Sequence, residues 1–233
     1  MSRPLERVTA VFPRPIVNFV KQQVGRAVSG HLDALATVWF TDKGPRHHGY
    51  TAHYSRHLKR RRRSVETVLE IGIGGYGRRR YGGHSLYMWR SFFPHATIYG
   101  LDIHEKQLES THRITVLQAD QSDREALRRA VQACPSFDLV VDDGSHMGPD
   151  VVASFEVLFP LLNAGGIYAI EDVFYAYEPA FGGAPWTPGT TMALVKDALD
   201  DVNLGRGQVA AVHAYPGLVL IEKRPAPRNA IAR

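Results

Sequence analysis

The chain has 233 residues, of which 44% are hydrophobic, and its formal net charge is +5. This length and apolar content suffice for one α/β domain with a sizeable core, and they argue against global disorder. The single cysteine, Cys134, excludes an internal disulfide and any cysteine-based zinc finger, so we expect a reducing, cytoplasmic setting. No apolar run approaches the roughly 20 residues that a membrane span needs.

Residues 1–63 are expected to form a helical N-terminal extension that covers part of the substrate and cofactor sites. Apolar residues recur at helical spacing from Pro15 to Phe40. Gly25 and Gly30 interrupt this segment, so it can consist of two helices. Tyr50 to Leu58 is predicted to be a further helix.

Strand and helix patterns alternate through residues 64–224, which predicts a doubly wound, mostly parallel α/β sheet of the Rossmann-like kind. The five expected parallel strands are Ser64 to Ile71, Thr97 to Leu101, Ile114 to Leu117, Phe137 to Val141 and Gly166 to Ile170. An antiparallel hairpin, Gln208 to Ala214 and Leu218 to Glu222, is expected to close the sheet. Ser122 is predicted to cap the helix after the third strand, with Glu125 completing a capping box. Residues 225–233 are expected to be a flexible tail.

Acidic residues stand where two neighbouring strands end. Asp142 and Asp143 end the fourth strand and are followed by His146, and Glu171 and Asp172 end the fifth strand. Ligands of open parallel sheets bind beyond the carboxyl ends of the strands, so up to four carboxylates and one imidazole are expected around one cleft. Carboxylate oxygens suit Mg²⁺, with Mn²⁺ or Ca²⁺ as alternatives. The pattern predicts a metal site with a base beside it.

The segment Gly72 to Gly77 has the spacing G-x-G-x-x-G of a dinucleotide site, which is weak evidence alone. Glu70 precedes it, where a dinucleotide site usually keeps an apolar residue. Asp102 ends the second strand and can accept both ribose hydroxyls. Asp120 follows the third strand, where it can hold an adenine amino group. Acids at three strand ends suit S-adenosylmethionine (SAM), whose amino-acid tail is positive, whereas they would repel a pyrophosphate.

From Thr41 to Gly183 the sequence resembles the macrocin and mycinamicin family of sugar O-methyltransferases. The matching segments are TDKG, HHGYTAHY, LEIGIGGYG, GGHSLYMW, GLDI, QADQSD, VVDDGSH and IEDVFYAYEPAFGG. The resemblance implies a class I methyltransferase fold and a SAM-dependent, Mg²⁺-dependent enzyme that methylates a hydroxyl of a saccharide or glycosylated metabolite. Only about 60 residues precede the first strand, whereas the mycinamicin enzyme carries a large extra N-terminal domain. A compact mycobacterial group, the methylmannose polysaccharide 1-O-methyltransferases, also looks similar, which would make the product a methylated mannoside.

The resemblance implies metal ligands at Asp143, Glu171 and Asp172 and a catalytic base at His146. It places SAM against the glycine-rich segment, and the complete set of predicted cofactor-binding residues is Glu70, Gly72, Gly74, Ser85, Asp102, Asp120, Gln121 and Asp142. A bound cation would lower the pKa of the sugar hydroxyl, and His146 would take its proton. The aromatic loop Phe174 to Trp186 can stack on a sugar ring. We expect a sugar or oligosaccharide acceptor and no nucleic-acid partner. We also expect a homo-oligomer, namely a dimer.

Three other interpretations stay open at the level of sequence. An NAD(P)-dependent oxidoreductase is favoured by the glycine spacing and opposed by Glu70. A basic surface-binding module is suggested by the basic run Lys59 to Arg63. This run lacks interleaved aromatic residues, so a solvated turn is the favoured interpretation. A zinc site could use His53 and His57 at helical i, i+4 spacing, but both precede the sheet, so a solvated or capping role is favoured. The roles of four neighbouring residues, His47, His48, Tyr50 and Tyr54, are left open.

Overall fold

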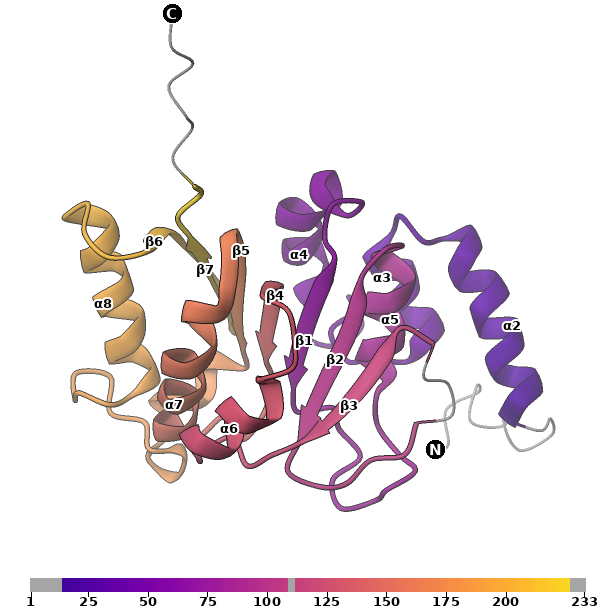
Figure 1. Cartoon of the computed structure of the whole chain (residues 1–233), viewed down its shortest axis with the longest axis horizontal. Coiled ribbons are helices and arrows are strands. Elements are labelled where there is room, and N and C mark those ends of the chain that lie inside the picture. The colour runs from indigo at the N-terminus through magenta and orange to yellow at the C-terminus, as the bar shows by residue number, and fades with distance from the viewer. Residues whose placement is uncertain (1–13, 109–111, 227–233) are drawn as a thin grey trace, which may run out of the picture.

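The computed structural model describes residues 14–108 and 112–226, so the predicted tail is outside the described part from residue 227 onward. Its centre is a seven-stranded sheet of order β3-β2-β1-β4-β5-β7-β6 (Figure 1). The strands are β1 (Thr67–Ile71), β2 (Thr97–Asp102), β3 (Ile114–Gln118), β4 (Phe137–Asp142), β5 (Leu162–Glu171), β6 (Val209–Tyr215) and β7 (Leu218–Lys223). The first five pair in parallel, and β7 is antiparallel to both of its neighbours. The predicted fold class and edge hairpin are confirmed.

Helices cover both faces of the sheet. The helices are α2 (Arg14–Ala27), α3 (Leu32–Trp39), α4 (Tyr50–Leu58), α5 (His84–Phe92), α6 (Arg124–Val131), α7 (Gly148–Leu158) and α8 (Thr191–Asn203). One hydrophobic core lies beneath α3, α4 and α5, and a second lies beneath α6, α7 and α8 (Figure 1). Strand β1 is buried along its whole length because it lies between these two layers. None of the helices formed by the described residues has the length and apolar composition of a membrane span.

The N-terminal segment is two helices rather than one. Between α2 and α3 the chain turns at Val28 to His31, and His31 is extended. Helix α4 has the predicted bounds. It is followed by a 3₁₀ turn, η1 (Lys59–Arg61), made by the first part of the basic run.

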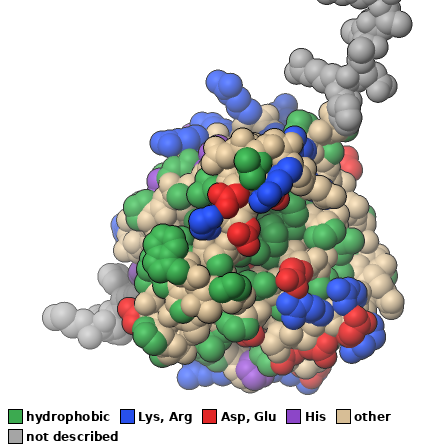
Figure 2. Space-filling view, turned by 90° about the vertical axis from the view of Figure 1, so that its left-hand side faces the viewer, with side chains coloured by type: hydrophobic (Ala, Val, Ile, Leu, Met, Phe, Trp, Pro, Cys, Tyr) green, Lys and Arg blue, Asp and Glu red, His purple; other side chains and the backbone are tan. Residues whose placement is uncertain are grey.

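The basic run is only partly solvated. The half-buried Arg61 donates to the carbonyl of Gly165 at 2.6 Å, and Arg62 donates to the carbonyl of Phe92 at 3.0 Å. These two guanidiniums therefore tie the N-terminal extension to the sheet and to α5. On the face shown in Figure 2, which carries α8 and the sheet edge, basic, acidic and apolar side chains are interspersed.

Three local predictions are wrong. Strand β1 begins at Thr67 instead of Ser64, because the backbone N–H of Ser64 still donates to the carbonyl of Arg61 within the preceding turn. The N-cap of α6 is Asp123, whose side chain accepts from the backbone N–H groups of Glu125 and Ala126, while Ser122 donates its hydroxyl to Asp120 at 2.7 Å. An aspartate one residue later outcompetes the serine because its carboxylate accepts both N–H groups at once. Strand β5 begins at Leu162 instead of Gly166, because Leu162 already pairs with Phe137.

The loops after β1 and β4 touch at Gly72. This glycine has a left-handed φ of 79°, and a Cβ atom there would lie 2.0 Å from the carbonyl oxygen of Asp143. Gly74 also has a left-handed φ, 72°, but nothing lies within 4 Å of its missing Cβ. The close approach at Gly72 sets the distance between the glycine-rich segment and the acidic end of β4.

These two glycines provide a matched pair of substitutions. Gly74→Ala is expected to cost about 1–2 kcal/mol of unfolding free energy, the strain of a left-handed alanine. Gly72→Ala adds a collision with backbone and is expected to cost clearly more or to prevent folding. Urea unfolding followed by circular dichroism measures both, and equal losses would contradict the close approach.

Candidate active site

The acidic ends of β4 and β5 lie side by side, because Asp142 is in register with Ile170. Oxygen and nitrogen atoms of Asp143, His146 and Asp172 lie within 4.8 Å of one another, and His146 Nε2 is 3.8 Å from Asp172 Oδ2. His146 and Asp172 both have left-handed backbones, with φ of 58° and 53°. Such conformations are uncommon for residues other than glycine, and they cluster at functional sites. The predicted meeting of acids and imidazole is therefore found for these three residues.

A lysine that the sequence reasoning missed sits at the centre of the acidic group. The ammonium nitrogen of Lys43 is 2.7 Å from Asp143 Oδ2, 2.7 Å from Glu171 Oε2 and 3.4 Å from Glu70 Oε1. Its side chain is only 1% exposed. Lys43 belongs to the matching segment TDKG, but a lysine in a loop has no periodicity that would assign it to a buried site. It joins the ends of β1, β4 and β5.

Burial and charge oppose each other in this group. Burial lowers the pKa of Lys43, but the carboxylates of Asp143, Glu171 and Glu70 outweigh it and raise that pKa well above its usual value. Burial raises the pKa of Glu171 well above its usual value, although the charge of Lys43 counteracts the effect. The pKa values of Glu70 and Asp143 are also raised, chiefly by burial. One ammonium cannot neutralise all of these carboxylates, so the group favours a further cation.

Helix α4 supplies two tyrosines to the same group. The hydroxyl of Tyr50 donates to Asp172 Oδ1 at 2.6 Å, and that of Tyr54 donates to Glu171 Oε1 at 2.6 Å. Their i, i+4 spacing puts both on one face of the helix. His48 stacks on Tyr50 with ring centroids 5.1 Å apart, and its Nδ1 is 3.8 Å from Asp172 Oδ1. The carboxylates of Glu171, at the end of β5, and of Asp172, directly after it, are thus oriented by the N-terminal extension.

Asp142 lies in a separate buried network rather than beside Asp143. Its carboxylate accepts from Gln121 Nε2 at 2.6 Å, from Ser154 Oγ at 2.7 Å and from the Tyr168 hydroxyl at 2.9 Å. Successive side chains of a strand point to opposite faces, so the adjacent aspartates separate. Gln121 also accepts from the backbone N–H of Ser145 at 2.9 Å, which links the loops after β3 and β4.

The remaining predicted cofactor residues gather at the ends of β1, β2 and β3. Asp102 accepts from the backbone N–H of Ile73 at 3.3 Å and so lies against the glycine-rich segment. Glu70 is fully buried and accepts from Ser85 Oγ and Trp89 Nε1, both at 2.6 Å. Asp120 is exposed beyond β3.

A second missed lysine supports the glycine-rich segment. The buried Lys106 donates to the carbonyl oxygens of Gly74 and Tyr76, with the bond to Gly74 at 2.7 Å. Its ammonium thereby holds the glycine-rich segment in place.

An aromatic segment follows Asp172 and forms two 3₁₀ turns, η3 (Val173–Tyr177) and η4 (Pro179–Phe181). Tyr175 stacks on His146 with ring centroids 5.2 Å apart, and Phe181 packs on Tyr175 at 4.2 Å. Three further aromatics in or near these turns are exposed, Phe174, Tyr177 and Trp186. The segment therefore positions the imidazole and leaves apolar rings facing solvent.

Comparison with known proteins finds similar O-methyltransferases. The chain is 41% identical over 208 residues to the mycinamicin VI 2''-O-methyltransferase of Micromonospora griseorubida, covering 82% of this chain and 52% of that protein. It is 40% identical over 209 residues to the demethylmacrocin O-methyltransferase of Streptomyces fradiae, covering 82% and 53%. By sequence, this chain is similar to the O-methyltransferases of the macrocin and mycinamicin family over about half of their length. No family model matches it.

A solved structure of this family has the same fold. The methyltransferase MycE from the mycinamycin biosynthetic pathway, in complex with Mg and SAH, superposes with a TM-score of 0.75 and 38% identity. The match covers 85% of this chain and 55% of that chain, so the chain spans about half the length of the relatives it matches. The class I methyltransferase fold predicted from the sequence is confirmed, and these family members lend no support to an oxidoreductase.

Lys43 gives a test of the buried charge group. Lys43→Met leaves buried carboxylates without their ammonium partner, so we expect a loss of about 3–5 kcal/mol in the free energy of unfolding. Urea unfolding in metal-free buffer measures it. Lys196→Met is the matched control, because Lys196 forms an exposed i, i+4 pair with Asp200 and its removal should change stability little. A similar small change for both variants would contradict the central role of Lys43.

Proposed function

We propose that this protein is a SAM-dependent, divalent-metal-dependent O-methyltransferase that acts on a sugar hydroxyl. The observation that carries the proposal is the meeting of Asp143, His146 and Asp172 at the ends of β4 and β5. Such a group combines hard-oxygen metal ligands with a proton acceptor. The similar proteins named above are O-methyltransferases, which supports the proposal.

For the cofactor, we propose that SAM lies along the ends of β1, β2 and β3. The positive φ angles of Gly72 and Gly74 expose backbone at the first of these ends. Asp102 would accept the ribose hydroxyls, and the exposed Asp120 would accept the adenine amino group. Glu70 and Ser85 would act from beneath the glycine-rich segment, and Gln121 and Asp142 would position the adenine side through the network with Ser145.

For the metal, we propose Mg²⁺ held by Asp143, Glu171 and Asp172. The residues fit this ion, because they offer carboxylate oxygens in a group that has excess negative charge. Both oxygens of Glu171 already accept a hydrogen bond, from Lys43 and from Tyr54. Each oxygen keeps a second lone pair, so Glu171 can still serve as a ligand. When bound, the cation lowers the pKa of a hydroxyl that contacts it.

For the chemistry, we propose His146 as the general base. The imidazole of His146 can accept a proton at Nε2, the nitrogen that lies 3.8 Å from Asp172 Oδ2. Stacking on Tyr175 fixes the plane of its ring. When bound, SAM would supply the methyl group and leave as its neutral thioether. Nε2 of His146 would take the proton that the sugar hydroxyl loses as its oxygen accepts that methyl group.

For the acceptor, we propose a 1,2-diol on a saccharide or glycosylated metabolite, with a mannoside as one candidate. Three carboxylate ligands leave roughly three positions of an octahedral ion for other oxygens, and two adjacent hydroxyls can take two of them. Phe174 is 44% exposed and Tyr177 is 57% exposed, so both can stack on the apolar face of a sugar ring. This placement decides which hydroxyl faces the methyl group.

For the organisation, we propose residues 1–63 as the site-covering extension and residues 64–224 as the methyltransferase domain, in a cytoplasmic protein. Lys43, Tyr50 and Tyr54 support the first part, because they come from the extension and reach the acidic group. A homodimer is proposed from the exposed apolar side chains of Phe19, Val20 and Val24 on α2.

A direct methyl-transfer assay tests the proposed function. Labelled SAM is incubated with a panel of glycosides, with Mg²⁺ or with excess chelator. We expect labelled sugar only when the metal is present, and a much lower rate for an acceptor whose neighbouring hydroxyl is replaced by hydrogen. Undiminished transfer in excess chelator would contradict the metal site, and equal use of the deoxy acceptor would contradict binding of a diol.

His146→Ala separates catalysis from binding. A general base contributes about 10²–10⁴-fold, so turnover should fall by that factor while calorimetry shows unchanged SAH and Mg²⁺ binding. His112→Ala is the matched control, since His112 is an exposed histidine that precedes β3. Near-normal turnover of the His146 variant would move the base elsewhere, and His47→Ala and His48→Ala would then identify it.

A further inference from the structure

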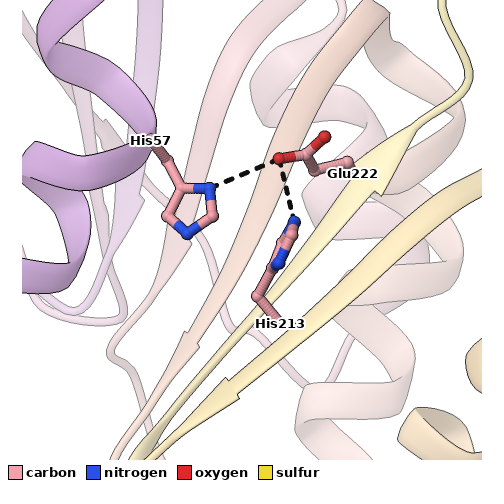
Figure 3. A group of neighbouring side chains, drawn as sticks. All are labelled: His57, His213 and Glu222. Atoms are coloured by element: carbon pink, nitrogen blue, oxygen red, sulfur yellow. Dashed lines mark hydrogen bonds and ion pairs between the residues drawn. The ribbon is translucent and has the colours of Figure 1, made fainter.

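A second cluster of metal-ligating side chains lies where α4 meets the edge hairpin (Figure 3). It consists of His57 from the last turn of α4, His213 from β6 and Glu222 from β7. One atom of each lies within 4.8 Å of the others. His53, which the sequence paired with His57 as a zinc alternative, is not a member and stacks on Tyr215 instead.

Two of the distances between the ligand atoms are close to those of a tetrahedral site. Glu222 Oε1 is 3.1 Å from His213 Nε2 and 3.5 Å from His57 Nδ1. A tetrahedral Zn²⁺ with bonds of about 2.0–2.1 Å separates its ligand atoms by about 3.4 Å. All three ligand atoms lie within 4.8 Å of one another, so a small cation between them can approach each one.

The outer nitrogen of His57 is also engaged. His57 Nε2 is 2.8 Å from the hydroxyl of Tyr215. If this nitrogen carries the proton, the lone pair of Nδ1 faces the Glu222 carboxylate, and two electron-rich atoms then need a cation between them. Metal-bound histidines characteristically donate their other N–H in this manner, which fixes the tautomer and the ring orientation.

The sheet register places the other two ligands. His213 pairs with Leu220, so Glu222 is two positions further along β7 and projects from the same face. The side chain of His57 is 11% exposed, whereas His213 and Glu222 are 33% and 32% exposed. A metal and a water as fourth ligand can therefore enter from solvent.

We propose that His57, His213 and Glu222 form a second divalent-metal site, which takes Zn²⁺ rather than Mg²⁺. Two imidazoles and one carboxylate are a zinc donor set, whereas Mg²⁺ prefers oxygens alone. The site is separate from the acidic group: His57 lies about 10 Å along α4 from Tyr50. The metal clamps α4 to the β6–β7 hairpin and thereby holds the helix that carries Tyr50 and Tyr54. The proposal does not depend on the proposed methyl transfer.

The test uses the whole chain, stripped of metal with a chelator and then kept in millimolar Mg²⁺ to saturate the acidic group. Zn²⁺ is titrated in competition with a chromophoric chelator, and Co²⁺ replaces it for absorption spectroscopy. We expect one tight Zn²⁺ per chain, the visible bands of tetrahedral Co²⁺ and a Zn²⁺-dependent rise in Tm. Tyr215→Phe should weaken Zn²⁺ by about 10–100-fold, and His213→Ala or the isosteric Glu222→Gln should weaken it more.

Two controls locate the ion. His112→Ala removes an exposed histidine elsewhere and should leave Zn²⁺ affinity unchanged, and His146→Ala removes the imidazole of the acidic group and should do the same. Circular dichroism confirms that each variant is folded. Absence of tight Zn²⁺ binding by the parent chain would overturn the proposal. So would retention of binding in folded His213→Ala and Glu222→Gln, or its loss in His146→Ala.

Discussion

The arrangement of this site depends on one buried ammonium. Lys43 contacts acidic residues from three strands, Glu70 on β1, Asp143 after β4 and Glu171 on β5. Without a positive charge these carboxylates would repel one another in a region where water is largely excluded, and their pKa values would rise further. Lys43 therefore allows the acids to approach closely while they remain negative enough to attract a second cation.

Helix α4 connects this charge group to the edge of the sheet. Tyr50 and Tyr54 bond to the carboxylates of Asp172 and Glu171, and His57, one turn further, faces Glu222 on β7. In the antiparallel pair of β5 and β7, Glu171 is opposite Leu218 and Ile167 is opposite Glu222. One face of α4 thus follows β5 and β7 from the active site to the hairpin, and a shift of the helix would disturb both ends together.

The strand order explains where the site lies. Strands β1 and β4 are neighbours, and the order of the sheet reverses between them. Crevices form at such a reversal, because the connections on its two sides leave toward opposite faces. Gly72 and Asp143 meet there, so the glycine-rich segment lies next to the acidic end of β4. A methyl donor on one side and a hydroxyl on the other would then be adjacent.

The sequence by itself determined the sheet and most of its strand ends, because hydrophobic periodicity and terminal acids are local signals. The predicted meeting of Asp143, His146 and Asp172 follows from these local signals, because the carboxyl ends of parallel strands lie at the same edge of a sheet. The tertiary structure alone decided that Asp142 turns away, that Asp123 rather than Ser122 caps α6, and that Lys43 is buried. Lys43 contacts residues 100 and 128 positions away, and His57 reaches Glu222 from another element. Such pairings leave no local pattern, since they depend on how helices pack over the sheet.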